Sequence, residues 1–157
     1  MIAAGTPFPD FTLPDQQGAM HSLTEYAGKW LVVYFYPRDN TAGCSLEASS
    51  FAALIKKYSG LDTAVIGVSA DSVKSHARFA EKLELPFTLL SDEEHGLLQA
   101  AGVWQKKKMA GREYMGIVRS TAIVDPQGVV RHAWTKVKVD GHAEAVLARL
   151  GELRGQH

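Results

Sequence analysis

The chain has 157 residues, of which 46% are hydrophobic and 22% are charged. This length suits one continuous hydrophobic core and is short for two, so we expect a single domain spanning residues 1–157. Seventeen Lys and Arg balance seventeen Asp and Glu, which argues against nucleic-acid binding because such proteins normally carry a basic excess that neutralises phosphates. The lysine cluster at 106–108 is a local exception, and we interpret it as part of a solvated loop.

The sequence also lacks the signals of membrane, secreted and metal-dependent proteins. Residues 1–6 contain no basic region and no apolar run of the kind found in signal peptides, and no segment approaches the length of a membrane span. We therefore expect a cytoplasmic protein with no membrane partner. One cysteine excludes an internal disulfide framework and a multi-thiolate zinc site. Six histidines are scattered without metal-ligand spacing, so we expect them to be surface or structural residues and expect no metal.

The first half of the chain alternates strand and helix patterns. Residues 7–23 have room for a short hairpin, and residues 30–36 form a continuous apolar run typical of a buried strand. Residues 42–58 carry an apolar stripe at steps of three and four, which predicts one helix. Residues 64–69 form a second buried strand. A helix then starts at Asp71 or Ser72 and ends near Leu83, before a Leu-Pro pair.

The second half predicts a strand at 87–90, a short helix at 92–101 and a loop rich in Lys and Gly at 105–114. Two further strands, at 117–124 and 129–134, flank a strong turn signal at 125–128. Asp140 is suited to cap a final helix with one apolar face. The resulting order, βαβαβαββα, implies an α/β protein with a mixed central sheet and helices on both faces. A thioredoxin-like architecture is compatible with this order.

Cys44 is the residue that points most directly to chemistry. A lone cysteine is usually an inert buried residue, but Cys44 follows a strand and falls in the first turn of the next helix. Unpaired backbone N–H groups and the helix dipole favour an anion there, and the thiolate is the reactive form of cysteine. Ala48 and Phe51 follow on the same helical stripe, so the sulfur should point into a sheltered pocket. Pro37 ends the preceding strand.

Thr41 and Arg119 are the other candidate site residues. Thr41 lies three residues before Cys44, where a dithiol oxidoreductase would carry its second cysteine, so its presence argues for one-sulfur chemistry. Its hydroxyl is able to hydrogen-bond a peroxide, or only to cap the helix. Arg119 falls on a strand with mainly apolar neighbours, and a buried guanidinium requires an anion. On residue type that anion is a carboxylate, and the alternative is the Cys44 thiolate.

These residues resemble the active site of the peroxiredoxins. The segment PRDNTAGC, residues 37–44, matches the family's P-x-x-x-T-x-x-C motif, and Arg119 matches its distant arginine. Further segments, at 34–37, 67–72, 85–87, 90–92 and 114–121, are similar to those of the bacterioferritin-comigratory, or Q-type, subfamily. The likeness covers nearly the whole chain in order.

The resemblance implies a thioredoxin-like fold and reduction of hydroperoxides without a cofactor. Cys44 would attack the peroxide and become a sulfenic acid, with Thr41 and Arg119 positioning the substrate and Pro37 shielding the pocket. Thioredoxin or another thiol would recycle the enzyme, which we expect to be a monomer. Two alternatives on the same fold are a non-enzymatic peroxide sensor and a chaperone-like holdase.

The sequence departs from its relatives at the second, resolving cysteine. In this subfamily that cysteine often lies five residues after the first, here Ser49, or on the next long helix, near Ala80. Either the chain naturally has one cysteine, or a serine replaces one. Residues five apart on a helix have Cα atoms about 8.7 Å apart, beyond the roughly 7 Å reach of a disulfide. A bond between positions 44 and 49 would therefore require the helix to unwind.

Overall fold

The computed structural model describes residues 2–155. Their central feature is a five-stranded sheet in the order β5-β4-β3-β8-β9. Its strands are β3 (Trp30–Phe35), β4 (Thr63–Ser69), β5 (Thr88–Ser91), β8 (Ser120–Val124) and β9 (Val130–Thr135). β3, β4 and β5 run parallel, whereas β8 and β9 are antiparallel to their neighbours. The sheet is therefore mixed, as the order of elements predicted.

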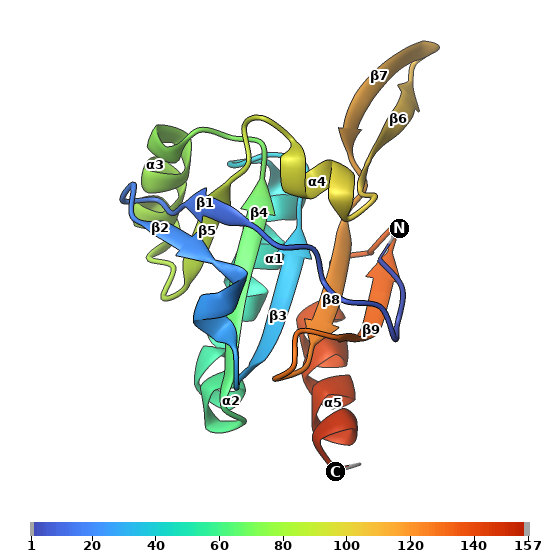
Figure 1. Ribbon diagram of the computed structural model, residues 1–157. Helices are drawn as coiled ribbons and strands as arrows, with labels where there is room; N and C mark the ends of the chain where they lie inside the picture. The colour runs from blue at the N-terminus through green and yellow to red at the C-terminus, as the bar shows by residue number, and fades with distance from the viewer. Residues whose placement is uncertain (1, 156–157) are drawn as a thin grey trace.

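Helices cover both faces of this sheet (Figure 1). They are α1 (Ala42–Ala53), α2 (Ile55–Gly60), α3 (Val73–Leu83), α4 (Gly96–Ala100) and α5 (His142–Arg154). One hydrophobic cluster joins α1, α2, α3 and α5 to the face that carries Val32 and Tyr34. A second cluster joins α4 and the N-terminal segment to the face that carries Leu31 and Val33. Because side chains alternate along a strand, the wholly buried β3 supplies both clusters. This is a thioredoxin-like α/β architecture, as expected.

The N-terminal stretch contains the short hairpin that the sequence allowed. Its strands are β1 (Thr12–Pro14) and β2 (Met20–Ser22), and a 3₁₀ helix, η1 (Leu23–Tyr26), follows them. The turn at 125–128 is also confirmed. The amide of Gly128 donates to the Asp125 carbonyl, and the Asp125 carboxylate accepts from the amides of Gln127 and Val129. Within residues 2–155, no helix is long and apolar enough to cross a bilayer.

Several helix boundaries differ from the predicted ones. The helix predicted over 42–58 is broken at Leu54, and both halves still pack on one cluster, so the apolar stripe did not reveal the break. The helix predicted over 92–101 is only the five-residue α4, because His95 enters it in a left-handed conformation. The cap predicted at Asp140 is wrong as well. Gly141, with φ of 72°, precedes α5 because the chain turns there through left-handed space.

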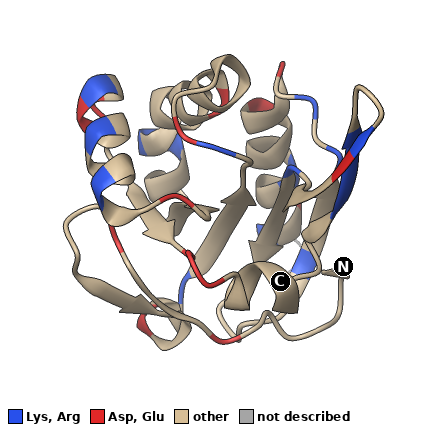
Figure 2. Cartoon of the chain, turned by 90° about the horizontal axis from the view of Figure 1, so that it is seen from above, with Lys and Arg blue, Asp and Glu red and all other residues tan. Residues whose placement is uncertain are grey.

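The loop predicted over residues 105–114 is instead a β-hairpin, formed by β6 (Trp104–Met109) and β7 (Arg112–Ile117). Ala110 and Gly111 both have positive φ, 52° and 79°, which is the geometry of a two-residue type I′ turn. Alanine is an unusual residue there, so the turn gave no clear signal in the sequence. The hairpin projects beyond the sheet (Figure 1) and concentrates basic residues (Figure 2).

Gly67 provides a test of how the core is packed. The Tyr34 ring lies across this glycine of β4, and a Cβ at position 67 would be 2.7 Å from Tyr34 Cζ and 2.9 Å from Leu89 Cδ2. We expect Gly67→Ala to lower the free energy of unfolding by about 1–3 kcal/mol through overpacking. Gly151→Ala is the control, because nothing lies within 4 Å of a Cβ there, and it should stabilise α5 by about 0.5–1 kcal/mol. Urea denaturation measures both, and equal changes would contradict this packing.

Candidate active site

Cys44 is the third residue of α1, which begins directly after the loop that follows β3. Its side chain is 1% exposed and belongs to the cluster between α1 and the sheet. Phe51 fixes the helix against the sheet, because its ring stacks on that of Tyr34 with centroids 4.8 Å apart. The sheltered position of the sulfur in the first turn of a helix is thus as expected, and the helix dipole favours a negative charge on it.

Thr41 is the N-cap of α1. Its hydroxyl oxygen accepts a hydrogen bond from the Cys44 amide at 3.3 Å and donates to the Arg38 carbonyl at 3.4 Å. The capping role considered from the sequence is therefore present. Thr41 is exposed and Pro37 is half-buried, and both belong to the loop between β3 and α1. Whether either residue contacts a peroxide stays a prediction.

Arg119 lies between β7 and β8 rather than inside one strand, which corrects the strand predicted over 117–124. The strand is interrupted because the backbone groups of Val118 and Arg119 form hydrogen bonds with residues outside the central sheet. The Val118 amide donates to the Val103 carbonyl, and the Arg119 carbonyl accepts from the Val137 amide. This break turns the guanidinium toward α1 instead of leaving it on the alternating face of a strand.

Both anions considered for Arg119 are present at once. Its Nη2 donates to Cys44 Sγ at 3.3 Å, and its Nη1 donates to Glu47 Oε1 at 2.5 Å. Gly43 leaves room for this approach, since a Cβ there would be 3.3 Å from Arg119 Nη2. One guanidinium therefore bridges two side chains from the same helix, with its fork of donors divided between them.

Glu47 is the site residue that the sequence analysis missed. It is 1% exposed, and its Oε2 is buried without a hydrogen-bond partner among the described residues. Burial raises the pKa of Glu47 to about 7, although the Arg119 charge and hydrogen bond oppose the rise. The available signal was its spacing, because a residue three after Cys44 lies on the same side of the helix.

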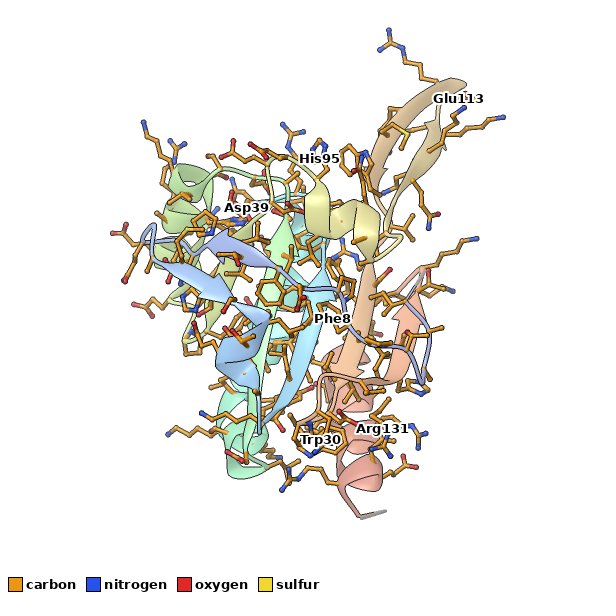
Figure 3. The ribbon with its side chains drawn as sticks, in the orientation of Figure 1. Phe8, Trp30, Asp39, His95, Glu113 and Arg131 are labelled. Atoms are coloured by element: carbon orange, nitrogen blue, oxygen red, sulfur yellow. The ribbon has the colours of Figure 1, made fainter. Side chains whose placement is uncertain are left out.

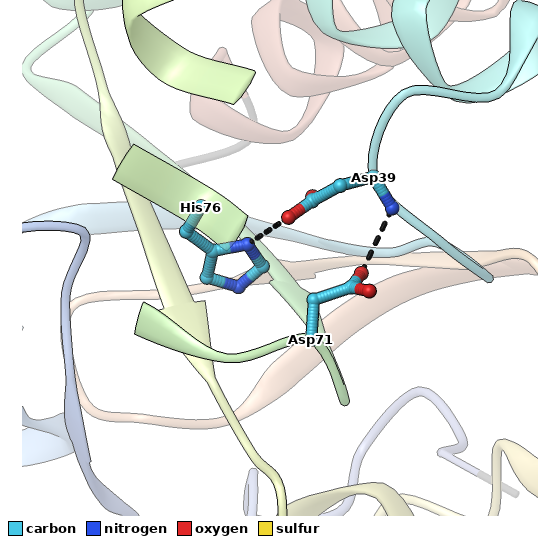
Figure 4. A group of neighbouring side chains, drawn as sticks. All are labelled: Asp39, Asp71 and His76. Carbon is cyan, nitrogen blue, oxygen red and sulfur yellow. Dashed lines mark hydrogen bonds and ion pairs between the residues drawn. The ribbon is translucent and has the colours of Figure 1, made fainter. Parts of the chain in front are cut away.

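A second group of polar residues holds the loop between β3 and α1. Asp39, Asp71 and His76 approach one another closely enough to suggest a metal site (Figure 4). His76 Nδ1 contacts Asp39 Oδ2 at 2.7 Å, and Nε2 donates to the Leu90 carbonyl at 2.9 Å. Asp71 Oδ2 accepts from the Asp39 amide at 2.8 Å. Both imidazole nitrogens are thus engaged by protein atoms, so these contacts fit a structural clamp better than a cation.

Asp39 is the centre of this clamp. Besides His76, its carboxylate accepts hydrogen bonds from the Tyr36 hydroxyl at 2.6 Å and from the Ser75 hydroxyl at 2.8 Å. The loop that leads into α1 is thus tied to β3 and to α3 by buried polar contacts. Asp39 and Trp30 lie toward opposite ends of the molecule (Figure 3), so the clamp acts at the end of β3 where Cys44 is placed.

His142, on α5, is a further buried histidine, and it contacts the Thr121 hydroxyl at 2.8 Å.

Comparisons with known proteins show the family of the chain. The AhpC/TSA family model matches residues 4–133, so the chain belongs to the AhpC/TSA family. Within it, the chain is similar to peroxiredoxin Bcp of Bacillus subtilis, at 44% identity over 97% of each chain. It is also 44% identical to a putative peroxiredoxin Bcp of Coxiella burnetii, over 95% of this chain and 99% of that one.

Solved structures give the same result. A peroxiredoxin Q of Xanthomonas campestris superposes with a TM-score of 0.90 at 43% identity, over 95% of this chain and 98% of that one. A PrxQ of Xylella fastidiosa gives a TM-score of 0.93 at 37% identity, over 98% of both. The chain is a peroxiredoxin of the Bcp, or Q-type, group.

The raised pKa of Glu47 predicts a specific dependence of stability on pH. The folded state holds the Glu47 proton more tightly than the unfolded chain, so the contribution of Glu47 to stability is complete below about pH 4.5 and is lost as the pH rises through 7. Over that window the loss should be about 3 kcal/mol. Glu47→Gln cannot ionise and should lack it.

The comparison is best made in a Cys44→Ser background, where thiol ionisation does not contribute. Urea denaturation at several pH values between 4.5 and 7.5 gives one stability curve with Glu47 intact and one for the Glu47→Gln variant. Glu113→Gln, which changes an exposed carboxylate that pairs with Lys106 and Lys108, is the control. If the curves with and without the Glu47→Gln substitution ran parallel, Glu47 would not titrate in this window.

Proposed function

We propose that this peroxidase reduces hydroperoxides with Cys44 as the attacking sulfur and Arg119 as the residue that positions the peroxide. The observation that carries the proposal is the 3.3 Å contact between Arg119 Nη2 and the buried Cys44 Sγ at a helix N-terminus. A related structure of the Xanthomonas campestris bacterioferritin comigratory protein, 42% identical over 96% of this chain, concerns alkyl peroxide reduction. Hydrogen peroxide and alkyl hydroperoxides are accordingly the proposed substrates.

The first step forms a bond between Cys44 Sγ and the terminal peroxide oxygen and breaks the O–O bond. Cys44 takes the terminal oxygen with its hydrogen and is oxidised to a sulfenic acid, and the other oxygen takes up a proton from solvent and leaves as water or an alcohol. Negative charge moves from sulfur to the leaving oxygen during the step. Arg119 supports both ends of this transfer, because its donors favour the thiolate and can then hold the oxygen on which charge develops.

The proposed roles of Thr41 and Pro37 are to position the peroxide and to shield the pocket. Thr41 is suited to its role because its hydroxyl is already fixed at the first turn of α1 by the Cys44 amide. The clamp of Asp39, Asp71 and His76 keeps the loop that carries both residues in place. No resident cofactor or metal takes part in this proposal.

Recycling requires a thiol from outside the chain. Cys44 is the only cysteine, so the sulfenic acid forms a mixed disulfide with an external thiol, releasing water, and a second thiol then releases Cys44. The proposed partner is thioredoxin or a small thiol, acting on a cytoplasmic, monomeric enzyme. Without such a thiol, excess peroxide carries the sulfur on to sulfinic acid.

The direct test is peroxide consumption with excess dithiothreitol. Cys44→Ser should abolish it, and Arg119→Met should slow the reaction with peroxide by about 100-fold or more, as for loss of one charge-stabilising donor. Stability of the Arg119→Met variant is measured in parallel. If that variant were less stable but reacted at the normal rate when folded, Arg119 would be a structural partner of Glu47 only.

The position of Ser49 gives a prediction about recycling. Ser49 is exposed on α1 while Cys44 is buried on the same helix, so an internal disulfide needs the first turns of α1 to unwind. We expect Ser49→Cys to form this disulfide after peroxide treatment and to turn over with thioredoxin. Mass spectrometry detects the bond, and Ser50→Cys is a matched control one residue further along. Oxidation of Cys44 without any bond to position 49 would show that this is not a resolving position.

A further inference from the structure

Lys107 is set apart from the two lysines beside it on β6. Lys106 and Lys108 have side chains that are 66% and 76% exposed, and both pair with Glu113, at 3.4 and 3.8 Å. Glu113 lies far out on the hairpin (Figure 3). Since side chains alternate along a strand, Lys107 points to the opposite face and is half-buried. It is thus the lysine of the cluster that faces the body of the protein.

The backbone of β7 holds the Lys107 side chain in place. Its Nζ donates to the Ile117 carbonyl at 2.8 Å, two residues before Arg119. The aliphatic part crosses Gly116, where a Cβ would be only 3.0 Å from Lys107 Cδ. A glycine at this position therefore leaves the passage open for the lysine. These contacts bring a second positive charge, the Lys107 ammonium, to the connection that carries Arg119.

The charges at Cys44 do not balance without this lysine. When Glu47 and the Cys44 thiol are both ionised, the single charge of Arg119 faces two negative charges. The neighbouring groups on β3 and α5 add no cation near pH 7. Tyr34, from β3, stays neutral because burial raises its pKa well above 10, and burial lowers the pKa of His142, from α5, to about 4. With both groups ionised, the site therefore has one negative charge more than Arg119 alone can match.

The pKa of Lys107 is affected by the charged groups of this site. Its pKa is lowered first by burial and then by the positive charge of Arg119, whereas the charge of Cys44 opposes the shift. These effects agree with the position of the Lys107 ammonium at the Ile117 carbonyl, two residues before Arg119. The carboxylate of Asp39, in the loop before α1, is matched by His76 and two hydroxyl groups.

We propose that Lys107 is a positioning residue of the peroxidase site, whose charge lets Cys44 and Glu47 be ionised at the same time. It acts through electrostatics from the hairpin, so the reactive thiolate depends on two cations rather than on Arg119 alone. This inference rests on the proposed function only in taking the Cys44 thiolate as the attacking group. In this proposal, the contact between Lys107 and the Ile117 carbonyl serves to hold a positive charge near the reactive sulfur.

The test is the ionisation of Cys44 in Lys107→Met, measured by thiolate absorbance and by the pH dependence of alkylation with iodoacetamide. We expect the midpoint to rise by about one pH unit, which corresponds to a tenfold lower ratio of thiolate to thiol below the midpoint. At pH values below the midpoint, the reaction with peroxide should slow by the same factor. Alkylation requires no peroxide turnover, so this result is distinguishable from a failure of the proposed peroxidase function.

Three further kinds of variant make the test specific. Lys107→Gln keeps a hydrogen-bond donor for the Ile117 carbonyl but lacks the charge, so it should behave like Lys107→Met even if the latter disturbs the hairpin. Lys107→Arg should restore the normal midpoint. Lys106→Met and Lys108→Met remove the same charge from the outer face and should leave the midpoint unchanged. An unchanged midpoint in Lys107→Gln, or an equal shift in Lys108→Met, would overturn the proposal.

Discussion

A guanidinium group placed between a helix and a sheet has to be matched by anions, because an unpaired charge in a low-dielectric site costs several kcal/mol. Arg119 meets this requirement with Glu47 and Cys44, which come from one turn of α1. The contact joins residues 72 and 75 positions apart in the chain. It holds the start of α1 against the connection from β7 to β8. Because one guanidinium contacts both groups, the ionisation of the Cys44 sulfur and that of the buried Glu47 carboxylate affect each other. Stability and reactivity are coupled at this point.

The loop before α1 is organised by a separate set of contacts. Asp39 gathers hydrogen bonds from Tyr36, Ser75 and His76, so the end of β3, the active-site loop and α3 form one polar unit. A buried network of this kind specifies a single arrangement only if its members are satisfied. Here they are, and the loop therefore reaches α1 in a defined conformation. Thr41 completes the arrangement as the cap of the helix that presents Cys44.

The β6–β7 hairpin adds to the site from outside the main sheet. Its pairing is mostly internal, yet one of its lysines returns across Gly116 toward Arg119. Polar strands whose outer lysines share a carboxylate can extend into solvent and still carry an inward-facing charge, because alternate residues face opposite sides. An element that contributes little to the hydrophobic core thereby influences the reactive sulfur.

The sequence by itself determined the main strands, the mixed α/β class and the candidates Cys44, Thr41 and Arg119. Continuous apolar runs such as 30–36 have few alternatives to a buried strand, and a cysteine directly after such a strand falls at a helix start by local geometry. Only the tertiary structure decided that Arg119 lies between two strands rather than inside one, and that Glu47 is buried beside it. It also decided that Lys107 turns inward on a hairpin. A Glu or Lys in an amphipathic segment is normally solvated, so its burial is visible only when a distant partner of opposite charge is brought to it by the fold.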